Sequence, residues 1–250
     1  MRLISVIHSK ILRFRLRSKY FYFMNSIPKN SILADFTTVL HGDCSASSNE
    51  EFTHYDAFYF WIFTSIKESS GRLSILDLGG KKLANGILST SHSITSLNLL
   101  KPYDTISKVQ YVQADATQKL PFESNSFNTF ISPVSLNLIG LGRYGDAIDG
   151  DAIPRFIKEL TRVISSDGVL YISMVFGKSL ISFNNHISFK MSDILELFQN
   201  WELLDYLIDL RDENSCLNGQ RFTKDYKYVE KHLSNLENVI FLKFVRTRSF

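Results

Sequence analysis

Two stretches of this chain bring together residue types that can bind or activate a ligand. Asp115 follows the apolar run Val109–Val112 and precedes a loop closed by Leu120–Phe122. In an open α/β sheet ligands bind where strands end, so an acid in this position predicts a binding site. The second stretch, residues 140–151, reads GLGRYGDAIDGD and mixes glycines with charged and aromatic residues.

The glycine-rich stretch carries the groups expected of a substrate site. Glycines let the backbone turn tightly or approach a ligand closely. Arg143 supplies a guanidinium fork suited to carboxylate or phosphate, and Tyr144 can stack on a sugar ring. Asp146 and Asp149 can accept hydrogen bonds from sugar hydroxyls, and Asp146 can also remove a hydroxyl proton. The alternative is a structural loop in which an internal Arg–Asp pair and the glycines fix the geometry.

His186 is a further candidate. It ends the segment FNNH at residues 183–186, after the strand expected at residues 169–175. A neutral imidazole is a suitable general base near pH 7. The alternative is a structural or solvated histidine, which is the commoner role of a lone histidine.

Composition and motifs exclude several classes of protein. The 250 residues, 44% of them hydrophobic, fit one α/β domain or a domain with a small appendage. Cys44 and Cys216 lie far apart without metal-ligand spacing, so no metal site is predicted. The chain has no HExxH, Walker A or G-x-S-x-G string, which leaves metalloprotease, P-loop and α/β-hydrolase functions without support.

Charge is unevenly distributed along the chain. The first thirty residues hold seven Lys or Arg and no acid, whereas the whole chain holds 28 basic and 25 acidic side chains. The rest of the chain is therefore mildly acidic, and no nucleic-acid partner is expected. Basic residues interleaved with large apolar ones fit a helix lying on an anionic membrane surface. An added helix packed on the domain is the alternative. The two cysteines, which lie far apart, are compatible with a reducing cytoplasm, so a cytoplasmic location, with or without peripheral membrane contact, is expected.

Hydrophobic periodicity predicts how these residues are positioned. Helices are expected over residues 50–68, 151–164 and 191–198, the last with Ser192 as N-cap, and strands over 72–80, 94–100, 109–112, 127–132, 169–175, 202–210 and 239–245. Strands alternating with helices or loops predict a mostly parallel seven-stranded sheet with helices on both faces. Residues 1–69 are expected to form a basic and aromatic helical extension, and residues 70–250 the main domain.

Three fragments, in this order and at this spacing, resemble class I S-adenosylmethionine-dependent methyltransferases. They are ILDLGG at residues 75–80, QADATQKLPFESNSFNTF at 113–130, and ELTRVISSDGVLYIS at 159–173. The resemblance covers roughly residues 70–248 and implies a Rossmann-like fold with S-adenosyl-L-methionine as cofactor. It also implies that Asp77, Gly79 and Gly80 shape the cofactor turn, that Asn98 faces the ribose, and that Asp115 accepts from the adenine amino group. The alternative for each is an ordinary turn or capping residue.

A narrower resemblance is to the DUF268 family of methyltransferase-like proteins. It rests on GLGRYGDAIDGDA at residues 140–152, followed by FNNHISF at 183–189. Members of this family are often associated with bacterial surface-polysaccharide gene clusters, so the resemblance implies a sugar or glycan acceptor. In this hypothesis Arg143, Tyr144 and Asp149 bind the acceptor, and His186 or Asp146 removes the hydroxyl proton.

Several departures from these patterns define the rival hypothesis. Lys81 and Lys82 follow the first glycines, Asn98 replaces an acid, and Asn137-Leu138 replaces a Glu-His pair. These changes favour a non-catalytic methyltransferase fold that serves as a binding or scaffolding protein in envelope glycan assembly. A nicotinamide-dependent enzyme lacks support, because no G-x-G-x-x-G string follows the first strand. The oligomeric state is not predicted.

Overall fold

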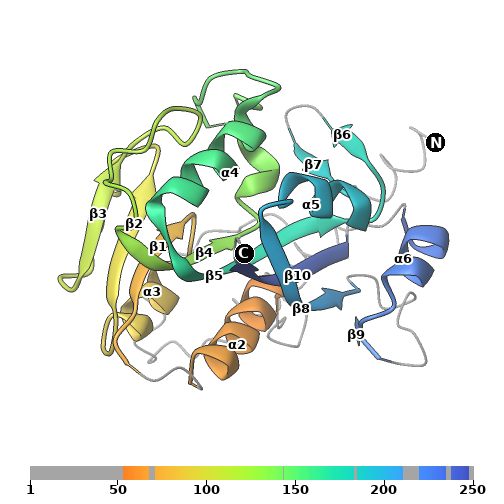
Figure 1. Cartoon of the computed structure of the whole chain (residues 1–250), viewed down its shortest axis with the longest axis horizontal. Coiled ribbons are helices and arrows are strands. Elements are labelled where there is room, and N and C mark those ends of the chain that lie inside the picture. Colours follow the sequence, from red (N-terminus) through yellow and green to blue (C-terminus); the bar gives the residue numbers. More distant parts are fainter. Residues whose placement is uncertain are drawn as a thin grey trace, which may run out of the picture. The chain divides into compact units, whose positions relative to one another are not determined.

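The computed structural model describes residues 53–67, 71–142, 144–182, 185–210, 220–234 and 238–247. Its centre is an eight-stranded sheet with the order β3-β2-β1-β4-β5-β10-β8-β9 (Figure 1). The strands are β1 (Ser74–Leu78), β2 (Ser93–Asn98), β3 (Val109–Gln113), β4 (Phe127–Pro133), β5 (Ile164–Phe176), β8 (Trp201–Asp209), β9 (Phe222–Thr223) and β10 (Asn238–Arg246). A separate hairpin joins β6 (Leu180–Ser182) to β7 (His186–Ser188).

Five strands of the sheet are parallel. β1 pairs with β2 and β4, β2 with β3, and β4 with β5, all in parallel register. β10 inserts between β5 and β8 and is antiparallel to both. The predicted count of seven strands was wrong by one, because β9 adds a two-residue antiparallel pairing to β8. A segment that short carries no alternation of apolar and polar residues, so periodicity does not reveal it.

Helices cover both faces of the sheet, as predicted. α4 (Ala152–Val163) and α5 (Met191–Leu197) pack with Leu76 and the other side chains of one face. α2 (His54–Lys67) and α3 (Lys82–Leu88) pack with Ile75 and the side chains of the opposite face (Figure 1). Neighbouring strand residues point to opposite faces, so the central strands β1 and β4 are largely buried on both faces, whereas β3 at the sheet edge is partly exposed.

The helix predicted around residues 50–68 is the aromatic helix α2. Its Phe58 is fully buried, and the Phe58 ring lies 5.4 Å from the Phe241 ring of β10. The predicted division of the chain at residue 70 stays a prediction. The basic stretch of the first thirty residues lies outside the described residues, and so does the expectation of membrane contact that rests on it.

Two local predictions differ from the structure. α5 begins at Met191 with Lys190 as its N-cap, and the Asp193 carboxylate accepts from the Lys190 N–H at 3.1 Å, so Ser192 is not the cap. β5 begins at Ile164 because the chain passes directly from α4 into the strand. The sequence also gave no signal for α3, the β6–β7 hairpin or α6 (Tyr226–His232).

Among the described residues no helix is both long and apolar enough to cross a membrane.

Candidate functional site

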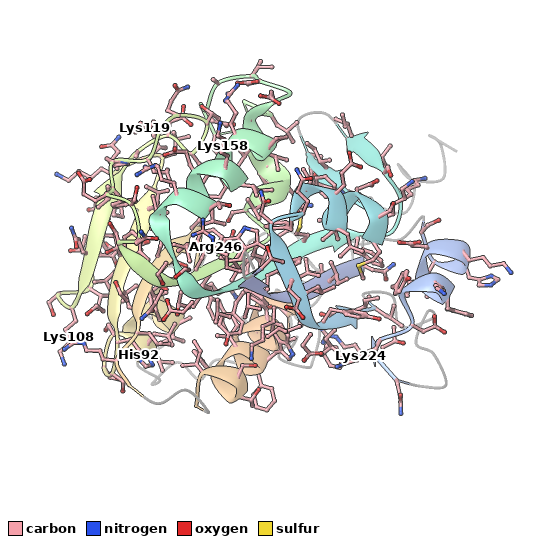
Figure 2. The ribbon with its side chains drawn as sticks, viewed as in Figure 1. His92, Lys108, Lys119, Lys158, Lys224 and Arg246 are labelled. Atoms are coloured by element: carbon pink, nitrogen blue, oxygen red, sulfur yellow. The ribbon has the colours of Figure 1, made fainter. Side chains whose placement is uncertain are left out.

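A cleft of about 400 Å³ opens at the carboxyl ends of the parallel strands. It lies where the strand order reverses between β1 and β4, the position at which open α/β sheets bind ligands. In Figure 2, Lys119, which follows β3, marks this end of the sheet, whereas His92 and Lys108 precede β2 and β3 at the other end. The lining residues are Tyr55, Leu78, Gly79, Leu97–Leu100, Ala114–Thr117, Pro133, Ser135, Leu138, Ile139, Tyr144 and Asp146.

The turn after β1 requires glycine at its first position. Gly79 has φ +75°, and a Cβ added there would lie 2.0 Å from Ser135 Oγ. A side chain at this position would therefore meet both backbone strain and a steric clash. Ser135, in the loop after β4, therefore lies close to the β1 turn, and both Gly79 and Ser135 line the cleft.

Asp77 lies behind this turn and organises it. Its buried Oδ2 accepts from Asn85 Nδ2 at 2.8 Å, Ser96 Oγ at 3.1 Å and Gly80 N at 3.3 Å. Burial raises the pKa of the Asp77 carboxyl to about 6, against the opposing effect of these three donors. Within the described part of the chain Oδ1 has no hydrogen-bond partner. Asp77 and Gly80 are absent from the lining, so they shape the turn from behind the cleft.

Asn98 and Asp115 stand side by side at the ends of β2 and β3. The Ala114 N–H donates to the Asn98 carbonyl at 2.9 Å, which ties the two strand ends together. Asn98 Nδ2 donates back to Ser96 O and Ser96 Oγ. The Asn98 amide oxygen accepts from no residue in the described ranges. Asp115 Oδ1 accepts from Thr117 N at 2.8 Å. Its Oδ2 accepts from no described residue, so one carboxylate oxygen is available to a ligand that lies in the cleft.

Apolar side chains form most of the remaining wall. Leu97, Leu99 and Leu100 come from the end of β2, and Ala114 and Ala116 flank Asp115. Flat apolar walls with a few convergent polar groups are typical of small-molecule sites. The arrangement suits a planar heterocycle whose edge reaches Asp115.

In the glycine-rich loop, the carboxylate of Asp146 binds the loop itself. Asp146 lines the cleft, but Oδ2 accepts from Gly140 N at 2.9 Å and Gly142 N at 3.3 Å, and Oδ1 accepts from Tyr144 N at 3.2 Å. These three bonds hold a loop in which Gly140, Gly142 and Gly145 all have positive φ. Tyr144 is 55% exposed at the edge of the cleft. Arg143 lies outside the described residues.

Asp149 is held by the first turn of α4. It forms an ion pair with Arg155 and accepts from Asp151 N at 2.9 Å. The bond from Arg155 lowers the pKa of the Asp149 carboxyl. Arg155 also donates to the Thr117 carbonyl at 3.3 Å, which ties the loop after β3 to α4. Asp149 is not part of the lining.

The structure does not bring His186 to the cleft lining. It lies on β7, half-buried, paired with Ser182. Fully buried Asn137 fixes this strand, because its Nδ2 donates to the Ile187 carbonyl while its Oδ1 accepts from Val175 N at 3.1 Å. Asn137, which stands where the family pattern has a Glu, thus joins β7 to β5.

Tyr55 and Ser135 also line the cleft, although the sequence did not single out either residue. Tyr55 lies one turn before Tyr59 on α2, and the Tyr59 hydroxyl accepts from Lys81 N at 3.0 Å. Once Tyr59 reaches the β1 turn, helical spacing places Tyr55 on the same side of α2. A tyrosine pair four apart was therefore the available signal. No group of His, Cys, Asp or Glu within the described ranges could hold a metal ion.

The fold is that of solved class I methyltransferases. The 1,6-didemethyltoxoflavin-N1-methyltransferase of Burkholderia thailandensis, solved with its substrate and S-adenosylhomocysteine, is 11% identical, with a TM-score of 0.54 over 78% of each chain. The N-methyltransferase NodS of Bradyrhizobium japonicum WM9, in complex with S-adenosylhomocysteine, is 11% identical, with a TM-score of 0.53 over 79% of this chain and 90% of that one. The [4+2]-cyclase SpnF is 14% identical, with a TM-score of 0.53 over 76% and 82%. At these identities the similarity establishes the fold.

The family is shown by sequence. The profile described as "Caenorhabditis protein of unknown function, DUF268" matches residues 82–238, which is more than half of the chain. The chain therefore belongs to the DUF268 family, as the glycine-rich stretch predicted. A search of curated proteins gave no significant match.

Proposed function

We propose that this protein is an S-adenosylmethionine-dependent methyltransferase that acts on a small-molecule acceptor. One observation carries the proposal. At the ends of β2 and β3, Asp115 presents a carboxylate oxygen and Asn98 an amide oxygen that no described residue uses, both in an apolar cleft beside the β1 turn. Two similar folds were solved with S-adenosylhomocysteine bound, which supports the same class of ligand here.

The residues present fit a nucleoside cofactor. Asp115 Oδ2 would accept from an adenine amino group, Asn98 Oδ1 would accept from a ribose hydroxyl, and Leu99 and Ala116 would flank the base. Asp77 and Gly80 would hold the turn at which the amino-acid part passes Gly79. When bound, S-adenosylmethionine supplies an electrophilic methyl group. The protein contributes proximity and orientation, which are the main source of acceleration for an in-line displacement.

The acceptor would enter beside the glycine-rich loop. Tyr144 and Asp146 line that side of the cleft, and the adjacent Arg143 and Asp149 complete the predicted set. Asp146 lies nearer to the proposed reaction than His186, because only Asp146 belongs to the lining. A sugar or surface-polysaccharide intermediate is the finer proposal, since a half-exposed tyrosine can stack on a sugar face. That part rests on the family resemblance stated above.

Isothermal titration with S-adenosylmethionine and S-adenosylhomocysteine tests the cofactor site. Micromolar binding of either ligand supports the proposal and justifies transfer assays with a labelled methyl group and a panel of hydroxyl and amine acceptors. Absence of binding at millimolar ligand would reject the methyltransferase function.

The rival function, a non-catalytic scaffold in envelope glycan assembly, is favoured by one feature of the site. The Asn98 amide donates to Ser96 where a carboxylate would bind ribose with charge assistance. A scaffold would show no cofactor binding and would instead co-purify with protein partners. The titration above separates the two functions.

A further inference from the structure

Lys81 and Asp56 form an ion pair next to the cleft. Neither residue belongs to the set proposed above to bind the nucleoside. Lys81 Nζ lies 3.6 Å from Asp56 Oδ1, and the two side chains are 45% and 43% exposed. The same ammonium lies 4.9 Å from the centre of the Tyr55 ring. Because Tyr55 lines the cleft, the pair stands at the cleft's edge.

Asp56 is positioned before any ligand arrives. Thr53 donates to Asp56 Oδ2 from both its hydroxyl and its backbone N–H, the latter at 3.0 Å. These bonds direct Oδ1 toward Lys81. A separation of 3.6 Å is longer than an N–H···O hydrogen bond, so the two charges attract each other but do not satisfy each other's hydrogen-bonding capacity.

The backbone places Lys81 on the path of a ligand tail. Lys81 comes two residues after Gly79, and its own N–H is fixed by the Tyr59 hydroxyl at 3.0 Å. A nucleoside held at Asn98 and Asp115 would direct a 5′ substituent past Gly79. The Lys81 ammonium lies beside both Asp56 and Tyr55, and Tyr55 lines the cleft.

We propose that the Lys81–Asp56 pair recognises the α-amino-acid end of the cofactor, an inference that rests on the proposed function. The Lys81 ammonium binds the ligand carboxylate, and Asp56 Oδ1 binds the ligand ammonium. When the zwitterionic end of the ligand binds, the long Lys81–Asp56 ion pair is replaced by two ion pairs, one between Lys81 and the ligand carboxylate and one between Asp56 and the ligand ammonium. The cleft therefore selects a nucleoside that carries an amino acid over the same nucleoside without it.

The chain offers a matched control. Lys82 occupies the next position and has similar exposure, but it pairs with Asp104 at 3.0 Å. Replacing Lys82 removes the same charge from the same turn without touching the proposed site.

The test compares S-adenosylhomocysteine with 5′-methylthioadenosine by titration at low salt. The full-length protein should bind S-adenosylhomocysteine at least about tenfold more tightly. Lys81→Met should reduce that ratio to about threefold or less by weakening only S-adenosylhomocysteine, Asp56→Asn should reduce it in the same way, and Lys82→Met should leave it unchanged. Thermal unfolding of each variant checks that the fold is retained.

The outcomes separate this inference from the proposed function. Equal binding of the two ligands by the unmodified protein, or an unchanged ratio in Lys81→Met, overturns the inference and leaves the cofactor site intact. Failure of both ligands to bind overturns the cofactor site and the inference together.

Discussion

The strand ends and the glycine-rich loop both present acids to the same cleft, but they use them differently. At the strand ends Asp115 gives one oxygen to its own turn and keeps the other available. In the loop Asp146 binds three backbone amides, and Asp149 pairs with Arg155. A regular strand satisfies its own backbone groups, whereas an irregular loop needs side chains to do so. An acid at a strand end is therefore freer to bind a ligand than an acid in a loop.

The largest expected difference between the two regions is at their glycines. Gly79→Ala should abolish S-adenosylhomocysteine binding and lower the free energy of unfolding by more than about 2 kcal/mol, because backbone strain adds to the clash with Ser135. Gly145→Ala has comparable strain at φ +91°, but nothing lies within 4 Å of an added Cβ. It should cost about 1 kcal/mol and leave binding unchanged. Denaturant unfolding and titration of both variants measure this, and equal effects would contradict the comparison.

The next prediction compares one acid from each region: replacing Asp115 should mainly weaken ligand binding, whereas replacing Asp146 should mainly lower stability. Asp115→Ala should weaken S-adenosylhomocysteine binding at least about tenfold, because a charge-assisted bond to the ligand is lost, and should lower the free energy of unfolding by no more than about 1 kcal/mol, because only the Thr117 amide loses its acceptor. Asp146→Ala should leave binding within about threefold and lower the free energy of unfolding by about 1–2 kcal/mol, since three amides lose their acceptor. Weak binding in Asp146→Ala with unchanged stability would reverse the assigned roles.

The sequence predicted the strand-end region better than the loop. The apolar runs 94–100 and 109–112 predict two strands, and the family resemblance places Asn98 and Asp115 at their ends. Parallel pairing then brings these two residues together. The role of Asp146 depends on positive φ at the surrounding glycines, and that of Asp149 depends on Arg155, six residues away in the first turn of α4. Neither follows from residue type. Helix α3 was missed because it has seven residues and no side-chain cap at Lys81.

A pH-dependent effect concerns the buried acid behind the strand ends. Burial raises the pKa of Asp77 to about 6, whereas an unfolded Asp titrates near 3.9. Between these values the folded protein binds the extra proton, so stability contributed by Asp77 falls as pH rises from about 4 to about 6 and is then constant. The difference in unfolding free energy between the unmodified protein and Asp77→Asn should drop by about 2–3 kcal/mol over this range. A flat difference across denaturant titrations at pH 4, 5, 6 and 7 would show that Asp77 is not protonated there.

The smallest expected effect is a gain in ligand affinity when an acid is placed at the end of β2. Asn98→Asp restores an acid that can accept both ribose hydroxyls, but it loses the two bonds that Asn98 Nδ2 makes to Ser96. S-adenosylhomocysteine binding should tighten by about three- to tenfold, which titration resolves. Weaker binding would indicate that the amide bonds to Ser96 hold the strand end in its binding geometry.

The most direct test of the central claim is a crystal structure of the full chain grown with S-adenosylhomocysteine. The account predicts the adenine between Leu99 and Ala116, with its amino group on Asp115 and the amino-acid part passing Gly79. A cleft without ligand at saturating concentration, or a ligand bound away from the ends of β2 and β3, would contradict it.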